Sequence, residues 1–208
     1  MQKLILIGSG GHAKVIADTL SIQGRKITAC VTLDTNLDTF CGVPVIGGDS
    51  ELEKYSPKDA VLANGIGSIP GKIARWEISK KYRALGYQFL TVLHPSAFIS
   101  ACAHISNGVQ IMAGALIQAG VTIGEDTIVN TGAILDHDCD VGANCHIAPG
   151  VTCSGEVSIG ESCHVGTGAT IIQRVLIGPR SVVTAGAIVK KDLPAGSFQR
   201  SMTLPSFK

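Results

Sequence analysis

The chain has 208 residues, of which 45% are hydrophobic and 16% charged, a balance that excludes a disordered chain. Its 17 Lys and Arg are offset by 16 Asp and Glu, and the net charge of +1 excludes the strongly basic surface that binds nucleic acid or an anionic membrane. No apolar run approaches the ~18 residues of a membrane span. The opening run ends at Gly8 and is too short for a signal peptide.

Residues 3–93 alternate between strand and helix patterns, which is typical of a small parallel sheet with helices on its faces. Ser68 is expected to cap the second helix and Gly86 to end it. Apolar residues recur at helical spacing, namely Val15, Ile16, Thr19 and Leu20 in the first helix and Ile73, Trp76 and Leu85 in the second. The predicted elements are strands Lys3–Gly8, Ile27–Val31, Val61–Leu62 and Tyr87–Leu93, a helix over Gly11–Leu20 and a helix between Ser68 and Gly86.

A glycine-rich loop, residues 8–13, joins the first predicted strand to the first helix. Its glycines would let the backbone approach a phosphate, and the start of the helix offers free N–H groups. Asp34 follows the second strand, where a contact with a ribose hydroxyl is expected. The loop could also be a structural turn or part of a nicotinamide enzyme, but ~90 residues form only half of a dinucleotide fold. A mononucleotide or a nucleotide sugar fits this length better, and a second loop, residues 64–67, could contact the same ligand or simply be a turn.

From residue 94 the apolar pattern changes to a strict period of six. This period is typical of a parallel β-helix, in which each hexapeptide forms one flat side and three of them close a coil. Sixteen hexapeptides make roughly five coils, and we place the domain boundary between residues 93 and 94. The inward positions are Ile99, Ile105, Ile111, Ile117, Ile123, Val129, Leu135, Val141, Ile147, Cys153, Ile159, Val165, Ile171, Ile177, Val183 and Val189.

The seven cysteines are odd in number and form no Cys-x-x-Cys pair. We therefore expect reduced thiols and a cytoplasmic location. Four of them fall at inward phases of the β-helix, so we interpret them as core residues rather than metal ligands or nucleophiles: Cys139, Cys145, Cys153 and Cys163.

His137 lies between Asp136 and Asp138, and a histidine flanked by carboxylates can be held in one tautomer as a base. The alternative is a solvated polar corner. His146 and His164 are one coil apart and should stack, either as a plain ladder or as the lining of a groove. His137 and His146 are half a coil apart, so they could meet only across a subunit contact. Zinc sites of the trimeric carbonic anhydrase type use a close His pair, which the sequence lacks, so we expect no metal.

These motifs together resemble those of bacterial hexapeptide-repeat sugar acyltransferases with a short nucleotide-binding N-terminal domain. The similarity is greatest to N-acetyltransferases of nucleotide-linked 4-amino sugars of the bacillosamine and perosamine type, with sialic acid O-acetyltransferases as siblings. Two departures are Asp138, where relatives often carry Glu, and the end of the chain, where relatives commonly have Gly-x-Pro-Ala-Lys. The segments that carry the resemblance are Gly8–Val15, His94–Ala97, Val129–Ala133, Asp136–Cys139, His146–Gly150 and Cys153–Gly155.

The resemblance implies a half-Rossmann βαβ domain, residues 1–93, followed by a left-handed parallel β-helix, residues 94–208, in a homotrimer with active sites between subunits. It implies that His137 is the catalytic base and that Asp138 orients it. Acetyl-CoA would be bound by His146, Gly155, Gly166 and Lys190, with the Gly155 N–H on the acetyl carbonyl and Lys190 near the phosphates. The nucleotide sugar would be bound by Gly10, Gly11, His12, Asp34, Gly65, Gly67 and Asn130.

The implied reaction is direct transfer of the acetyl group of acetyl-CoA to the 4-amino group of a UDP-, dTDP- or GDP-linked 4-amino-dideoxy sugar, with no metal and no acyl-enzyme. Two alternatives remain, O-acetylation of a free sugar such as sialic acid and a non-catalytic nucleotide-binding scaffold. The glycine-rich loop and Asp34 favour a nucleotide-linked acceptor, because a free sugar would leave a phosphate-binding loop without a ligand.

Overall fold

The computed structural model describes residues 2–34 and 36–201. The chain divides into two compact units, Met1–Pro95 with Asn107–Val109 and Ser96–Ser106 with Gln110–Lys208. The first joint follows Pro95, close to the boundary that the sequence pattern suggested. Part of the atypical C-terminal tail, residues 202–208, lies outside the described residues.

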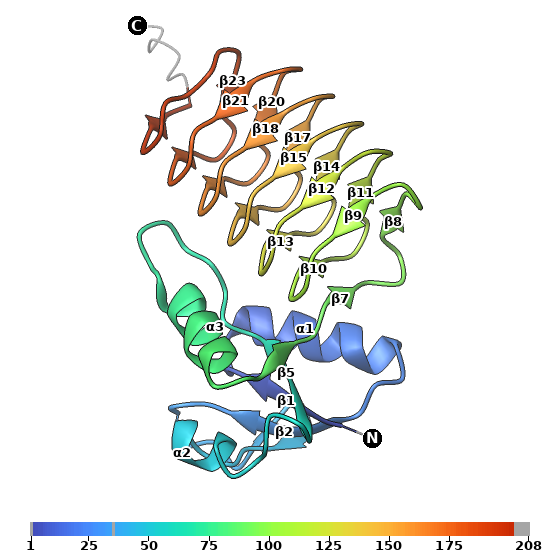
Figure 1. Ribbon diagram of the computed structural model, residues 1–208, viewed down its shortest axis with the longest axis vertical. Coiled ribbons are helices and arrows are strands. Elements are labelled where there is room, and N and C mark those ends of the chain that lie inside the picture. Colours follow the sequence, from blue (N-terminus) through green and yellow to red (C-terminus); the bar gives the residue numbers. More distant parts are fainter. Residues whose placement is uncertain (1, 35, 202–208) are drawn as a thin grey trace, which may run out of the picture. The chain divides into compact units, whose positions relative to one another are not determined.

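The N-terminal unit is built on a parallel sheet with the strand order β2-β1-β5-β6, which confirms the predicted βαβ pattern. Its strands are β1 (Lys3–Ile7), β2 (Ile27–Val31), β5 (Ala60–Asn64) and β6 (Gln88–Phe89). Helix α1 (Gly11–Ile22) connects β1 to β2, and helix α3 (Ala74–Ala84) connects β5 to β6 (Figure 1). Because the chain runs first to one side of β1 and then to the other, the carboxyl end of β1 is the switch point at which such sheets bind ligands.

Three short elements of this unit were not predicted. Strands β3 (Thr39–Phe40) and β4 (Val43–Pro44) form an antiparallel hairpin, and α2 is a single turn over Asp49–Leu52. The predicted closing strand Tyr87–Leu93 is instead two strands, β6 and β7 (Val92–Leu93). Elements of two to four residues are too short to leave a period in the sequence, which explains why they were missed.

The prediction for the second helix was wrong in its start and in its buried face. Helix α3 begins at Ala74, and its cap residue Ile73 makes no side-chain capping hydrogen bond, so Ser68 is not the cap. Ile73, Trp76 and Leu85 are exposed, whereas the buried residues are Arg75, Ser79 and Tyr82. Val15 on α1 is likewise 42% exposed, although Ile16, Thr19 and Leu20 are buried as predicted. None of the helices in residues 2–34 and 36–201 is long and apolar enough to span a bilayer.

The C-terminal unit is a parallel β-solenoid, as predicted from the period of six (Figure 1). The strands pair in parallel with the strand three positions later, so that Ile117 lies beside Leu135 and Leu135 beside Cys153, except at the end of the stack, where the last strand pairs with the strand two positions before it. The strands are β8 (Phe98–Ile99), β9 (His104–Ile105), β10 (Gln110–Ile111), β11 (Leu116–Ile117), β12 (Thr122–Ile123), β13 (Ile128–Val129), β14 (Ile134–Leu135), β15 (Asp140–Val141), β16 (His146–Ile147), β17 (Thr152–Cys153), β18 (Ser158–Ile159), β19 (His164–Val165), β20 (Thr170–Ile171), β21 (Leu176–Ile177), β22 (Val182–Val183), β23 (Ile188–Val189) and β24 (Phe198–Gln199).

The second residue of each strand from β8 to β23 is one of the sixteen predicted inward positions. Those from Ile111 to Val189 are all buried, which confirms the predicted core. Ile99 and Ile105 are only half-buried, because they belong to the first coil and have a coil on one side of them within this unit. Cys139, Cys145, Cys153 and Cys163 are also buried inside the coils as free thiols.

Candidate active site

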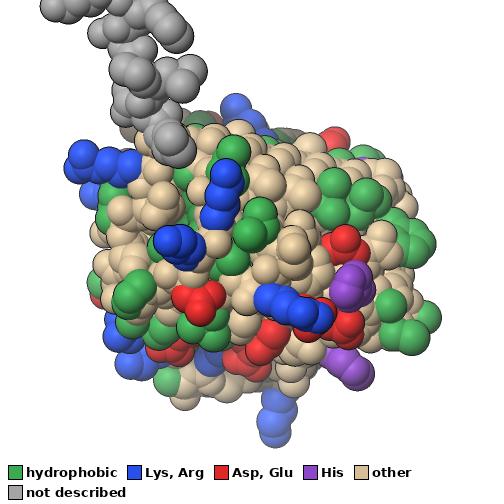
Figure 2. Space-filling model, turned by 90° about the horizontal axis from the view of Figure 1, so that it is seen from above, with side chains coloured by type: hydrophobic (Ala, Val, Ile, Leu, Met, Phe, Trp, Pro, Cys, Tyr) green, Lys and Arg blue, Asp and Glu red, His purple; other side chains and the backbone are tan. Residues whose placement is uncertain are grey.

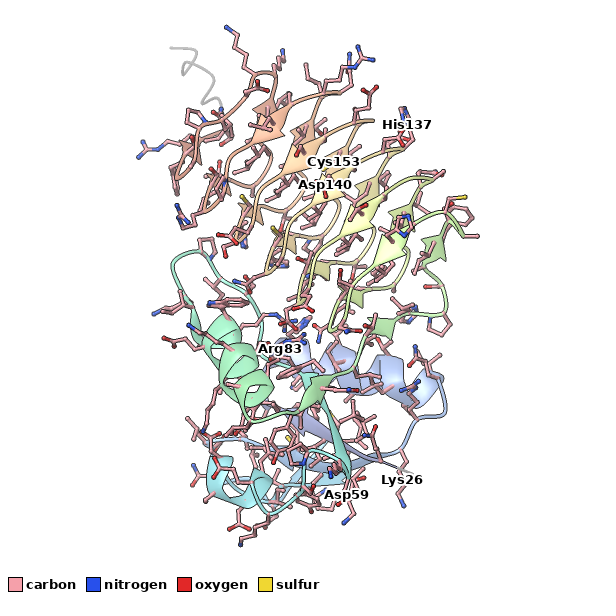
Figure 3. The ribbon with its side chains drawn as sticks, in the orientation of Figure 1. Lys26, Asp59, Arg83, His137, Asp140 and Cys153 are labelled. Atoms are coloured by element: carbon pink, nitrogen blue, oxygen red, sulfur yellow. The ribbon has the colours of Figure 1, made fainter. Side chains whose placement is uncertain are left out.

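His137 and Asp138 form a hydrogen-bonded pair at the corner that follows β14. The Nδ1 atom of His137 lies 2.9 Å from Oδ2 of Asp138, and both side chains are more than half exposed. A carboxylate oxygen can only accept, so Nδ1 carries the proton of the neutral ring and Nε2 is left as the basic nitrogen. Asp136 fixes the backbone of the same corner, because its Oδ1 accepts a hydrogen bond of 2.7 Å from the N–H of His137. Figure 3 shows His137 at the outer margin of the coils and Cys153 within them.

Acidic neighbours raise the pKa of His137 above its ordinary value. The hydrogen bond to Asp138 is the largest cause; desolvation opposes it, and the charges of Asp136, Asp138 and Glu156 add to the rise. Glu156 is also held by Arg174 from the next coil, with Nε to Oε2 at 3.1 Å. The ring therefore gains a proton more readily than a free imidazole, which is the property required of a base.

Gly155 lies directly against the His137 ring, one coil further along the chain. A Cβ at this position would collide with Nε2 of the imidazole, so only glycine leaves the ring where it is. Among the residues that the structure describes, none accepts a hydrogen bond from the Gly155 N–H, so this donor is available to a ligand.

His146 on β16, His164 on β19 and Asn130, which follows β13, form a second polar column. Nδ2 of Asn130 lies 3.2 Å from Nε2 of His146, whose ring meets that of His164 edge-on with centroids 4.8 Å apart. Burial lowers the pKa of His164, so this imidazole is neutral at physiological pH. The stacking predicted from the one-coil spacing is confirmed, and Figure 2 shows histidine side chains beside acidic and basic ones on the face it draws.

The other two residues predicted for acetyl-CoA are Gly166, which follows β19, and Lys190, which follows β23. Gly166 is buried, and a Cβ there would collide with the backbone of Ala185 in the next coil, so close packing of the coils already accounts for this glycine. Lys190 is exposed and, with Lys191, lines a cavity of about 380 Å³ in the last coils.

The predicted nucleotide residues of the N-terminal unit cluster at the start of α1. Gly10 is the cap of the helix and Gly11 its first residue, so the N–H groups of the first turn point out of the helix end. Gly67 lies against His12, with 3.5 Å from the position of its absent Cβ to the His12 Cβ. Gly65 packs onto Ala13 and the carbonyl of Ile7, where no side chain would fit.

A cavity of about 850 Å³ opens at the carboxyl ends of β1 and β2. Its described lining contains none of the residues predicted for the nucleotide and instead includes Gly8, Thr32, Ile66, Asp49 and Lys81. Thr32 directly follows β2, and its Oγ1 lies 2.8 Å from Oγ of Ser9 and accepts a hydrogen bond from the N–H of Asp34. Asp34 itself is exposed, and its Oδ1 accepts a hydrogen bond from the backbone N–H of Asn36.

Two of these lining residues could have been found from the sequence. Gly8 is the last residue of the first predicted strand and Thr32 directly follows the second, and the ends of parallel strands meet at one sheet edge. No signal in the sequence connects Asp49 with Lys81, which lie 32 residues apart and meet only in the fold, with Nζ 2.8 Å from Oδ2.

Metal and thiol chemistry find no support at these sites. Within residues 2–34 and 36–201 no group of three or more His, Cys, Asp or Glu side chains could hold a metal ion. Burial raises the pKa of Cys139, which follows the His137–Asp138 pair, to about 11, so its thiol stays protonated at neutral pH.

Two family models match the chain. The model for the PglD N-terminal domain matches residues 3–81, and the model for bacterial transferase hexapeptide repeats matches residues 120–155. The first falls on the α/β unit and the second on the coils that carry His137, His146 and Gly155.

Solved structures match nearly the whole chain. One is a mutant of GDP-perosamine N-acetyltransferase from Caulobacter crescentus in complex with CoA and GDP-perosamine, at 36% identity and a TM-score of 0.89, covering 96% of this chain and 94% of that one. Another is the acetyltransferase domain of PglB from Neisseria gonorrhoeae FA1090 with acetyl coenzyme A, at 36% identity and a TM-score of 0.86, covering 96% of each chain.

A curated relative matches over a shorter stretch. UDP-N-acetylbacillosamine N-acetyltransferase from Bacillus subtilis (strain 168) is 36% identical over 120 residues, which are 54% of this chain and 52% of that protein. The match thus spans about half the length of the relative.

Proposed function

Because the chain belongs to the family of hexapeptide-repeat acetyltransferases with a PglD N-terminal domain, we propose that it transfers the acetyl group of acetyl-CoA to the 4-amino group of a nucleotide-linked dideoxy sugar. The observation that carries the proposal is the His137–Asp138 pair, whose Nε2 lies where a side chain of Gly155 would stand, so that the base is next to a residue whose N–H is available. A base and an oxyanion donor side by side are what acyl transfer to an amine requires.

In the proposed mechanism, His137 accepts a proton at Nε2 as the sugar amine attacks the thioester carbonyl. The carbonyl oxygen becomes an oxyanion, which the Gly155 N–H stabilises. The C–S bond then breaks, and the imidazolium returns its proton to the departing thiolate, so that charge and protons balance. Asp138 keeps the proton on Nδ1 and stabilises the imidazolium by its negative charge. The buried cysteine thiols take no part.

The N-terminal unit is the proposed site of the nucleotide. The start of α1 at Gly10 and Gly11 offers N–H groups suited to a diphosphate, and the neighbouring cavity is large enough for a nucleoside. His12, Asp34, Gly65 and Gly67 are retained as further proposed contacts in this unit. Asn130, beside His146 on the solenoid, is retained as a separate proposed contact of the nucleotide sugar. The relatives act on UDP- or GDP-linked sugars, so both nucleotides are candidates here.

We further propose a homotrimer in which His146 of one subunit acts with His137 of another, because the two histidines lie half a coil apart on different sides of one prism. Exposed apolar side chains at both ends of one face of the solenoid support such packing, with Phe98 at 53% and Leu116 at 36% exposure on β8 and β11 and Ile188 at 57% on β23. The free thiols fit a reducing compartment such as the cytoplasm.

The deciding experiment measures release of free thiol from acetyl-CoA with UDP-, dTDP- and GDP-linked 4-amino sugars, for the wild type and His137→Ala. We expect turnover on one nucleotide sugar and a loss of about 10²–10⁴-fold in kcat for the variant, which is the usual contribution of a general base. The melting temperature should be unchanged, because His137 is exposed. Wild-type kcat in the variant would reject the base, and turnover on free sialic acid alone would reject the nucleotide-linked acceptor.

A further inference from the structure

A glycine occupies the corner of the preceding coil that corresponds to Asp138. Gly120 lies one coil earlier, at a φ of +75°, and Asp138 occupies the same corner at a φ of +57°. The N–H of Asp138 donates to the carbonyl of Ala119, which fixes the two coils against each other at 3.0 Å. The two residues are therefore stacked, and the side chain of one fills the space above the other.

The space left by the missing side chain of Gly120 is occupied by the carboxylate of Asp138. A Cβ on Gly120 would collide with Oδ1 of Asp138 and would lie 3.3 Å from its Cγ, whereas Cα of Asp138 is 3.6 Å away. Oδ2 of the same carboxylate accepts the hydrogen bond from Nδ1 of His137. The position of the carboxylate and the absence of a side chain at residue 120 thus depend on each other.

We propose that Gly120 is a positioning residue for the His137–Asp138 pair, acting by leaving room for the carboxylate that orients the imidazole. The inference rests on the proposed function of that pair. An added Cβ would meet the mobile end of an acidic side chain rather than backbone, so Asp138 would turn away while the coil stays intact. Turning away breaks the hydrogen bond to Nδ1.

The other two carboxylates that face His137 are already engaged in bonds of their own. Asp136 is bound to the backbone N–H of His137, and Glu156 is bound to Arg174 through both of its oxygens. These are the acidic groups that face the ring besides Asp138 within the described residues. Displacement of Asp138 therefore leaves the imidazole without its orienting partner.

The test compares Gly120→Ala with Gly114→Ala. Both glycines lie at corners of the same coil with similar φ, +75° and +66°, so alanine strains the backbone alike at each. Only at residue 120 does the added Cβ meet another group, because nothing lies within 4 Å of the corresponding position at residue 114. The difference between the two variants therefore reports the contact with Asp138 and not the strain.

The first readout is the titration of the His137 ring protons by NMR, which needs no turnover. We expect the pKa of His137 to fall in Gly120→Ala toward the ordinary value of ~6.5 and to stay raised in Gly114→Ala. The second readout is the pH profile of kcat/KM on the sugar that the wild type accepts. Only in Gly120→Ala should the acidic limb of this profile shift to lower pH and kcat drop about tenfold.

Equal histidine pKa values and equal profiles in the two variants would overturn the proposal. If Gly120→Ala fails to fold, Gly120→Asn replaces it, because Asn tolerates positive φ better and still carries the Cβ. Adding Gly120→Ala to Asp138→Ala should cost no further activity, because no side chain is then left to displace, and an additive loss would also count against the proposal. A wild type with no turnover would reject the proposed function, while the NMR comparison would still decide the role of Gly120.

Discussion

At the scale of single residues, one carboxylate decides the state of the proposed base. Asp138 accepts a hydrogen bond from Nδ1 of His137 and raises the pKa of this histidine. The neutral ring, which is the reactive form, therefore predominates only at a pH above that raised pKa. The same bond fixes which ring nitrogen is free. Asp138 therefore sets both the working pH of the site and the direction in which His137 can take a proton.

Asp138→Asn should shift the acidic limb of the kcat/KM profile to lower pH, because the pKa of His137 falls when the negative charge is lost. The plateau above the limb should fall about tenfold or more, since a neutral amide stabilises the imidazolium less. Profiles between pH 5 and 9 measure both effects. Asp136→Asn is the control, because Asp136 bonds to the backbone and its loss should move the limb less. A limb that stays in place in Asp138→Asn would contradict the assignment.

At the scale of elements, helix α3 buries a polar face. Arg75 donates from Nη1 to the carbonyls of Asn64 and Ile66 at 2.9 and 2.7 Å, and Nδ2 of Asn64 donates to Ser79. Further along, the hydroxyl of Tyr82 donates to Oδ1 of Asp49 at 2.6 Å. These bonds tie α3 to the end of β5 and to α2, and they explain why the apolar residues at helical spacing face solvent.

Asp49→Ala should destabilise the fold by about 1–2 kcal/mol, because the hydroxyl of the buried Tyr82 loses its acceptor. Hydrogen bonds from Lys81 and then Tyr82 hold the pKa of Asp49 below its usual value, so this stability is present at neutral pH and lost as the pH falls through that lowered pKa. Urea denaturation at pH 7 and at pH 3 measures the difference between wild type and variant. Glu51→Ala removes an exposed pair with Lys54 and should cost under about 0.5 kcal/mol. Equal costs for the two variants would argue against the Asp49–Tyr82 bond.

At the scale of the whole molecule, the two units differ in how far the sequence predicts them. In the solenoid every inward residue repeats at a fixed step, so each position is predicted independently of tertiary contacts. In the α/β unit, the polar residues of α3 would be assigned to the solvent-exposed face from the sequence alone. In the structure they are buried, because they form hydrogen bonds with Asn64 and Asp49 from other elements. Prediction from pattern fails where buried residues are polar.

The candidate site divides in the same way. His137 and Asp138 are neighbours in the chain, and Gly155 is one coil away, so their proximity could be read from spacing. The cavity of the N-terminal unit is lined by Gly8, Thr32 and Lys81, which come from separate elements and meet only through the order of the strands. Such a lining becomes visible when the sheet is built.

Ile177→Ala should cost about 2–4 kcal/mol, because its side chain is buried between coils and leaves a cavity when truncated. Leu176→Ala on the same strand is the matched control, since Leu176 is 52% exposed and should cost less than about 1 kcal/mol. Denaturant titration of both variants gives the two free energies of unfolding. Similar values would mean that the outward face contributes as much as the core, contrary to the structure.

The constant 18-residue step between paired strands also bears on how the chain acquires its shape during synthesis. Each new strand finds its partner at the same short distance back along the chain, as β14 does with β11 and β17 with β14, so the entropy of closing each loop does not grow as the stack lengthens. Because each coil contacts only its neighbouring coils, the solenoid can fold by adding coils from one end. The corner that holds His137 is completed when Gly155 is in place, before the later coils of the stack have been synthesised.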